Sequence, residues 1–109
     1  MPTIQVNGVN LYYEWHGPAG APVVLLVNGV LMSTASWSFQ TPVLSRRYRL
    51  LLHDCRGQGQ SEHPAGPYSM YQHAADLVGL MEALQIEQAH VAGISYGGEI
   101  ALLTAIHWP

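Results

Sequence analysis

The chain has few charged residues and no run of basic ones. Charged side chains make up 10% of its 109 residues, hydrophobic ones make up 49%, and the formal net charge is −3. Because nucleic-acid-binding proteins carry basic patches, we expect no nucleic-acid partner. The small charged fraction indicates that much of the chain is covered, and the length is sufficient for one hydrophobic core.

Long apolar runs are absent as well. None approaches the roughly 20 residues that a membrane-spanning helix needs, so we expect no membrane span. Residues 1–5 have neither a basic start nor an apolar run, so we expect no secretory signal peptide there. Cys55 is the only cysteine, which excludes an internal disulfide and fits a reducing compartment, and we therefore expect a cytoplasmic protein.

The apolar residues that are present predict several strands. Residues 4–7 alternate in polarity, Asn7-Gly8 is a hairpin turn signal, and residues 11–15 can pair back onto the first strand. The continuous apolar run at 23–27 is typical of a strand that is buried on both faces of a parallel sheet, and residues 48–53 predict another apolar strand.

Helices are expected between and after these strands. A short helix is predicted over residues 36–45, with an interruption near Pro42. The last helix, over residues 98–108, is apolar nearly all round, so it should be buried. Ser69 and Gln72 fit a capping box at the start of a further, amphipathic helix. Its apolar positions recur at helical spacing, with polar residues on other faces: Ala74, Leu77, Val78, Met81 and Leu84 against Gln72, Asp76 and Glu82.

The order of these elements predicts an α/β fold. A β-hairpin followed by β-α-β-α-β-α implies a mostly parallel sheet with right-handed crossovers. No repeat, linker or low-complexity segment divides residues 1–109, so we interpret them as belonging to one domain.

Residues 93–97, Gly-Ile-Ser-Tyr-Gly, form a G-x-S-x-G motif between a predicted strand at 89–92 and the last helix. A sharp strand-to-helix turn of this kind is a nucleophile elbow, and an ordinary glycine-rich turn is the alternative. The serine of an elbow is held in a strained conformation, and flanking glycines avoid side-chain collisions. The motif therefore points to Ser95 as a nucleophile and to the Tyr96 N–H as a donor to an oxyanion.

Three landmarks occur in a fixed order along the chain. Asn28-Gly29-Val30 follows the first apolar run, Asp54-Cys55-Arg56-Gly57-Gln58-Gly59-Gln60-Ser61 follows the second, and the elbow with Gly98 comes third. Together they resemble the α/β-hydrolase superfamily over essentially the whole chain. That family usually has His-Gly-x, D-x-R-G-x-G-x-S and G-x-S-x-G-G at these places, and often a tryptophan after the first, here Trp37. Asn28 departs from the usual histidine.

The resemblance implies the N-terminal portion of an α/β-hydrolase fold that begins with a β-hairpin. It implies that the strand at 23–27 lies between those at 48–53 and 89–92, with all three parallel. It also implies that the Val30 N–H is the second oxyanion donor beside the Tyr96 N–H, each worth roughly 3 kcal/mol of barrier. No cofactor and no metal are implied.

Other polar residues near the landmarks are expected to be structural. Asn28 can replace histidine as a hydrogen-bonding group that organises its loop, and Arg56 should tie loops together. Another strand should separate His53 from the elbow, so we expect a satisfied, partly buried histidine there. Glu99 should favour the helix dipole. The remaining loop or polar-face histidines are expected in solvent: His16, His63 and His73.

A general base for Ser95 is missing. In the α/β-hydrolase order the acid and the histidine follow the serine, and only Glu99 and His107 do so. His107 lies roughly 16 Å from Tyr96 along the predicted helix, which is beyond hydrogen-bond reach of Ser95. We therefore expect residues 1–109 to be the N-terminal part of a single larger domain and to be inactive alone.

These features favour a serine-nucleophile hydrolase that acts on a small-molecule acyl substrate, an ester, lactone or thioester, through an acyl-enzyme. Residues 27–37 also resemble acyltransferases that make rhamnolipid precursors, but the chain keeps the D-x-R-G-x-G-x-S pattern from which those enzymes depart. Cofactor-free haloperoxidase-like members share the same landmarks, and non-catalytic receptors or scaffolds occur in the superfamily. These alternatives stay open, as does the oligomeric state.

Overall fold

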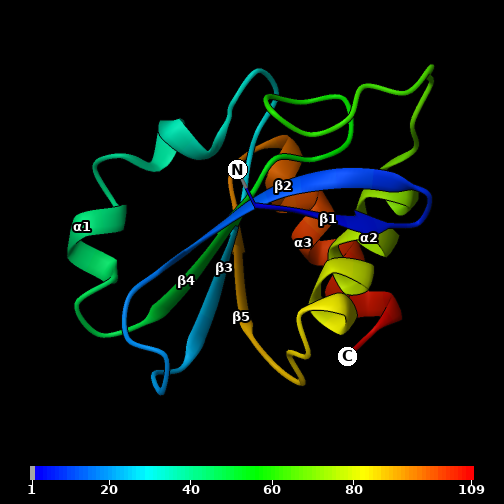
Figure 1. Cartoon of the computed structure of the whole chain (residues 1–109). Coiled ribbons are helices and arrows are strands. Elements are labelled where there is room, and N and C mark those ends of the chain that lie inside the picture. The colour runs from blue at the N-terminus through cyan, green and yellow to red at the C-terminus, as the bar shows by residue number, and fades with distance from the viewer. Residues whose placement is uncertain (1) are drawn as a thin grey trace.

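The computed structural model describes residues 2–109, which form one mixed sheet flanked by helices (Figure 1). The five strands lie in the order β1-β2-β4-β3-β5. The strands are β1 (Thr3–Val6), β2 (Val9–His16), β3 (Val23–Val27), β4 (Arg49–His53) and β5 (His90–Gly93). The helices are the 3₁₀ helix η1 (Thr34–Trp37), α1 (Thr41–Leu44), α2 (Met70–Ala83) and α3 (Tyr96–His107).

The predicted hairpin is confirmed. β1 and β2 pair antiparallel, with Val6 opposite Val9, so that Asn7 and Gly8 alone make the turn. Both turn residues have positive φ, 49° and 82°, which is the requirement of a type I′ turn. β2 then continues along β4, also antiparallel, and so joins the hairpin to the rest of the sheet.

The parallel centre of the sheet is confirmed as well. β3 pairs parallel with β4 on one side and with β5 on the other, so that Leu25 lies opposite both Leu51 and Val91. Leu25 and Leu51 are completely buried. Since parallel strands end at the same edge of a sheet, the segments that follow β3, β4 and β5 meet there.

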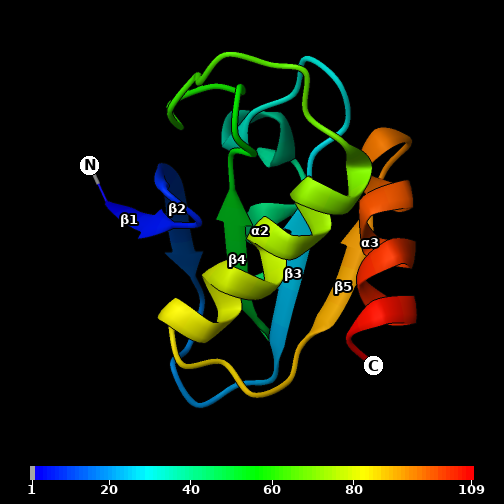
Figure 2. The ribbon, with the colours of Figure 1, turned by 90° about the vertical axis from the view of Figure 1, so that its right-hand side faces the viewer.

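Helices α2 and α3 pack together over one face of the sheet, while η1 and α1 lie on the other side (Figures 1 and 2). The start of α2 agrees with the prediction, because Ser69 Oγ accepts a hydrogen bond from the Gln72 backbone N–H at 3.0 Å. The Gln72 side chain does not close the box, since it donates to Asp76 at 2.9 Å. The sheet-facing residues of α2 that are completely buried are Ala74, Leu77 and Leu80.

Two helix predictions are corrected. The helix expected over 36–45, with an interruption near Pro42, is two short helices, η1 and α1, separated by residues 38–40. Pro42 lies in the first turn of α1, where its missing N–H costs nothing. The last helix begins at Tyr96 and is buried on one face only. On its outer face Leu102 and Ile106 are 63% and 61% exposed.

The outer edge of β5 is a further feature of this side of the molecule. Within residues 2–109 β5 pairs with β3 alone, and three of its four residues are exposed. In the same range no helix is long and apolar enough to cross a membrane.

Candidate functional site

Ser95 lies in a sharp turn at the end of the sheet. β5 ends at Gly93 and α3 begins at Tyr96, so the chain changes direction over only two residues, Ile94 and Ser95. Ser95 has φ 53° and ψ −116°, an unfavourable conformation for a residue with a side chain, and it is exposed. The strained conformation expected of the serine in an elbow is confirmed. Strain of this kind costs on the order of 1–3 kcal/mol and is found where it serves a function.

The glycines around Ser95 are required by close backbone contacts. A Cβ on Gly93 would lie 2.1 Å from the carbonyl oxygen of Gly97, and a Cβ on Gly97 would lie 2.2 Å from the carbonyl oxygen of Val27. Neither neighbour is a movable side chain, so no other residue fits without a shift of the backbone. The motif therefore also seats the elbow against the end of β3.

Val30 and Tyr96, the two residues expected to donate to an oxyanion, both line the cavity next to this turn. Val30 follows the end of β3, and Tyr96 is the first residue of α3, where the helix dipole adds partial positive charge. Both residues line a cavity of about 410 Å³, together with the segments 31–33 and 56–59 and with Tyr68 and His73. Neither N–H donates to another group within residues 2–109, so both are free to bind an anion.

Asn28 organises the loop that carries Val30, as predicted. Its side chain is completely buried and donates from Nδ2 to the His53 carbonyl oxygen at 3.0 Å and to Asp54 Oδ1 at 3.3 Å. Its Oδ1 accepts the Trp37 Nε1–H at 2.7 Å. Since an amide has both donors and an acceptor, one side chain ties β4 to both ends of the loop.

The loop after β4 is held by two carboxylates. Asp54 accepts backbone N–H groups from Thr34 and Gln60, each at 2.9 Å, and so bridges it to η1. Arg56 donates from Nε and Nη2 to Asp76 on α2 at 2.6 Å and 3.0 Å, and hydrogen bonding to Asp76 is the main reason that the Arg56 pKa is raised. Arg56 therefore ties the loop to α2, as expected. Asp76 was expected on a polar face of the helix, but it is buried.

His53 does not reach the elbow, because β3 separates β4 from β5. Its side chain is 2% exposed, and burial lowers its pKa to about 4. Nδ1 has no hydrogen-bond partner, and Nε2 lies 3.8 Å from Cys55 Sγ. His53 is therefore more deeply buried than expected, and only one of its two ring nitrogens, Nε2, has a partner within residues 2–109. Burial also raises the pKa of the Cys55 thiol to about 12, so the pair is neutral.

His73 is the main correction among the site residues. It was expected in solvent, yet it is 3% exposed and lines the same cavity as Val30 and Tyr96. Its ring lies edge-on to the Tyr96 ring, with 5.3 Å between the centroids. Burial lowers its pKa. The available signal was the spacing of His73 and Asp76, which puts both on the α2 face that meets the loop after β4.

The other predicted titratable residues do not complete a triad with Ser95. Glu99 is exposed in the first turn of α3, and His107 is exposed in its last turn, where its ring contacts Tyr71 at 5.3 Å. Along the axis of α3, His107 lies roughly 16 Å from Tyr96, the residue that follows Ser95. His16 is half-exposed and bonded to Glu14 at 2.8 Å, and His63 is exposed. Residues 2–109 contain no group of three or more side chains that could hold a metal ion.

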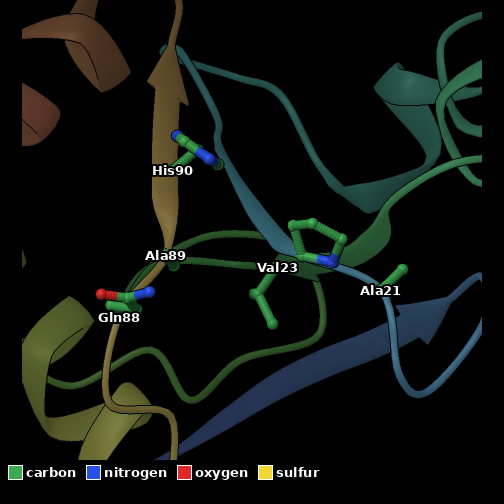
Figure 3. Close-up of a pocket in the computed structure, with 6 residues that line it drawn as sticks. Ala21, Val23, Gln88, Ala89 and His90 are labelled. Carbon is green, nitrogen blue, oxygen red and sulfur yellow. The ribbon is translucent and has the colours of Figure 1, made fainter.

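A second cavity, of about 390 Å³, lies at the opposite end of the sheet (Figure 3). It is lined by residues 21–23 before and in β3 and by residues 88–90 before and in β5. Ligands of open parallel sheets bind outside the carboxyl ends of the strands, and this cavity lies at the amino ends. The candidate site is therefore the cavity beside Val30 and Tyr96.

Comparison with known proteins places the chain among enzymes of one fold. The sequence model of the alpha/beta hydrolase fold matches residues 22–109. RutD of Caulobacter segnis, provisionally named a carbamate hydrolase, is 41% identical over 113 residues, which cover 100% of this chain and 42% of RutD. The 3-oxoadipate enol-lactonase 2 of Acinetobacter baylyi is 35% identical over 107 residues, covering 98% of this chain and 40% of the lactonase.

A solved structure supports the same family assignment. The enol-lactonase from Burkholderia xenovorans LB400 superimposes with a TM-score of 0.95 at 37% identity, covering 98% of this chain and 42% of the lactonase. The chain thus spans about two fifths of the length of the relatives that it matches.

Proposed function

Because this chain belongs to the alpha/beta hydrolase fold family, we propose that it carries the nucleophile and the oxyanion hole of a hydrolase for small esters, lactones or thioesters. The observation that carries the proposal is Ser95, exposed at the carboxyl end of the sheet with φ 53° between two sterically required glycines. The ψ of −116° sets Ser95 apart from an ordinary left-handed turn residue, and backbone strain of this kind in a residue other than glycine clusters at functional sites.

The reaction follows from the groups at the site. Ser95 Oγ attacks the substrate carbonyl carbon and loses its proton to a general base, while the carbonyl oxygen becomes an oxyanion between the Val30 and Tyr96 N–H groups. Collapse of this intermediate breaks the bond to the leaving group, which takes a proton, and leaves an acyl-enzyme. Water then attacks the acyl carbon by the same route and releases the acid.

The base is proposed to be a histidine oriented by a carboxylate, both supplied from outside these 109 residues. His53, His73 and His107 are the nearest alternatives, but His53 lies behind β3, His107 lies at the far end of α3, and His73 packs on Tyr96. We therefore expect the 109 residues alone to show no turnover that depends on Ser95.

A cyclic ester is the substrate that the relatives favour. Two of the three relatives described above are enol-lactonases by name, and one carries the name of a carbamate hydrolase. Both kinds of name describe attack on a carbonyl that bears an oxygen leaving group, which is the chemistry that a serine and two N–H donors perform.

The test is hydrolysis of p-nitrophenyl acetate and of a panel of simple lactones by the full-length protein. Ser95→Ala is expected to lower kcat/KM at least about 10³-fold, because the nucleophile is lost while the fold is kept. Ser38→Ala removes an exposed hydroxyl at the end of η1 and is the control that should leave the rate unchanged. Full activity of the Ser95→Ala variant would refute the nucleophile, and acyl transfer to an added alcohol in preference to water would identify a transferase.

A further inference from the structure

The cavity beside Val30 and Tyr96 contains a side chain for which the elbow chemistry has no use. His73, near the start of α2, is 3% exposed and lines this cavity. Its ring lies edge-on to the Tyr96 ring at 5.3 Å and to the Tyr68 ring at 5.9 Å. Two aromatic side chains therefore hold the imidazole in place directly beside the residue that carries a proposed oxyanion donor.

The protein does not use the ring nitrogens of His73. Nδ1 is sealed from solvent without a hydrogen-bond partner, and none of the side-chain hydrogen bonds found within residues 2–109, from Asn7 to Thr104, involves Nε2. Nε2 is therefore the nitrogen that can meet a molecule in the cavity. Unpaired buried N–H groups are rarer in proteins than unpaired buried acceptors, so the ring proton belongs on Nε2. Burial lowers the pKa of His73, so that at neutral pH the ring offers one neutral donor and no charge.

Two of the polar side chains around the cavity, Arg56 and Gln58, have partners in the protein. Arg56 is ion-paired with Asp76, and Gln58 Nε2 donates to the Gly29 carbonyl oxygen at 3.2 Å. The wall formed by Val30, Leu31 and Met32 is apolar. A ligand in this cavity thus meets an apolar wall and, at His73, a polar group that its own protein leaves unsatisfied, which favours a ligand with one oxygen acceptor on an otherwise apolar chain.

We propose that His73 Nε2–H donates a hydrogen bond to a keto or hydroxyl oxygen on the acyl chain of the substrate, and so determines specificity for oxygenated acyl groups over plain alkyl ones. This proposal rests on the proposed function of the Ser95 site. This oxygen must belong to the acyl chain of the substrate, because the oxygen of the reacting carbonyl is bound by the Val30 and Tyr96 N–H groups. A neutral donor selects a neutral acceptor, which is why a keto or hydroxyl group is assigned.

The first test compares p-nitrophenyl 4-oxopentanoate with p-nitrophenyl pentanoate, two esters of equal chain length. The full-length protein is expected to prefer the 4-oxo ester about tenfold in kcat/KM, the effect of one neutral hydrogen bond. His73→Phe keeps an aromatic ring at this position and removes the donor, so it should lose this preference. His73→Gln replaces the imidazole donor with an amide donor and should keep part of the preference. It is the variant to use if His73→Phe does not fold.

His90→Phe is the matched control, because His90 is exposed at the opposite end of the sheet and should leave the preference intact. A preference that survives in His73→Phe would overturn the proposal, as would its absence in the unaltered protein. Equal loss of both esters by more than about 100-fold would assign His73 to the chemical step itself and would overturn a specificity role.

A binding measurement separates this proposal from the proposed function. In the full-length Ser95→Ala variant, titration with methyl 4-oxopentanoate should shift the ¹⁵N resonance of His73 Nε2, and methyl pentanoate should not. The shift requires no turnover, so it would uphold the His73 site even if Ser95 proved to catalyse nothing. Turnover that depends on Ser95 without a selective shift would refute the His73 proposal alone.

Discussion

At the scale of single residues, burial decides the ionisation state of His53. Burial lowers its pKa from 6.5 to about 4, so between these values the unfolded chain binds a proton that the folded protein does not. The free energy of unfolding therefore falls as the pH drops from 6.5 toward 4, because the unfolded state gains the proton, and above pH 6.5 this contribution to the stability is complete. At 1.36 kcal/mol per pKa unit the loss is about 3 kcal/mol. Urea unfolding of the full-length protein across this pH range measures it.

His53→Phe is the variant that isolates this effect, because it keeps an aromatic ring and removes the titrating group. Its free energy of unfolding should depend on pH less steeply than that of the unaltered protein between pH 6.5 and 4. The burial of His73 acts in the same direction and remains in the variant, so some slope should persist. Equal slopes in both proteins would contradict the assignment.

At the scale of elements, one of the hydrogen bonds that hold the loop from β3 to η1 joins its two ends. Trp37 Nε1 donates to Asn28 Oδ1 at 2.7 Å and closes the loop that presents the Val30 N–H. Trp37→Phe removes this donor and keeps most of the ring. We expect kcat of the full-length protein to fall about tenfold with little change in KM, because the oxyanion contact strengthens only in the transition state.

Trp15→Phe is the control for this loop. Trp15 lies on β2 and stacks against the Arg49 guanidinium at 3.8 Å, so its replacement should lower stability and leave kcat unchanged. Unfolding curves of both variants separate the two effects. If Trp37→Phe changed stability by about 1 kcal/mol but not kcat, the hydrogen bond would be structural and the loop would not position the donor.

At the scale of the whole molecule, the face made by β5 and α3 exposes apolar side chains and, among the described residues, an unpaired strand edge. The outer edge of β5 is unpaired within residues 2–109, and Leu102 and Ile106 are more than half exposed. Unpaired edges and apolar patches promote association. The 109 residues expressed alone should therefore self-associate or unfold in part, which sedimentation velocity combined with a denaturant melt would detect.

Leu102→Glu with Ile106→Glu tests which feature causes this association. If the outer face of α3 dominates, the double variant should sediment as smaller species, whereas association through the β5 edge should persist. A compact monomer with one cooperative unfolding transition, found for the unaltered 109 residues, would show that this face needs no cover.

Local chemistry allowed several features to be predicted from the sequence. Asn7-Gly8 permits positive φ at two successive residues, which a two-residue hairpin turn requires. Gly93 and Gly97 flank Ser95 at the one spacing that a strand-to-helix turn tolerates. In both cases the cause lies within a few residues, where sequence patterns carry most of their information. The parallel order of β3, β4 and β5 also followed, through the resemblance of three landmarks.

Burial, by contrast, was decided only by the tertiary structure. His73 and Asp76 lie on what looks like the polar side of α2, yet the loop after β4 folds over them and puts Arg56 against Asp76 and a cavity against His73. Leu102 and Ile106 belong to an apolar helix, yet nothing among residues 2–109 covers them. A side chain's solvent exposure depends on which distant segment packs over it, and the periodicity of residues along one helix does not indicate that segment.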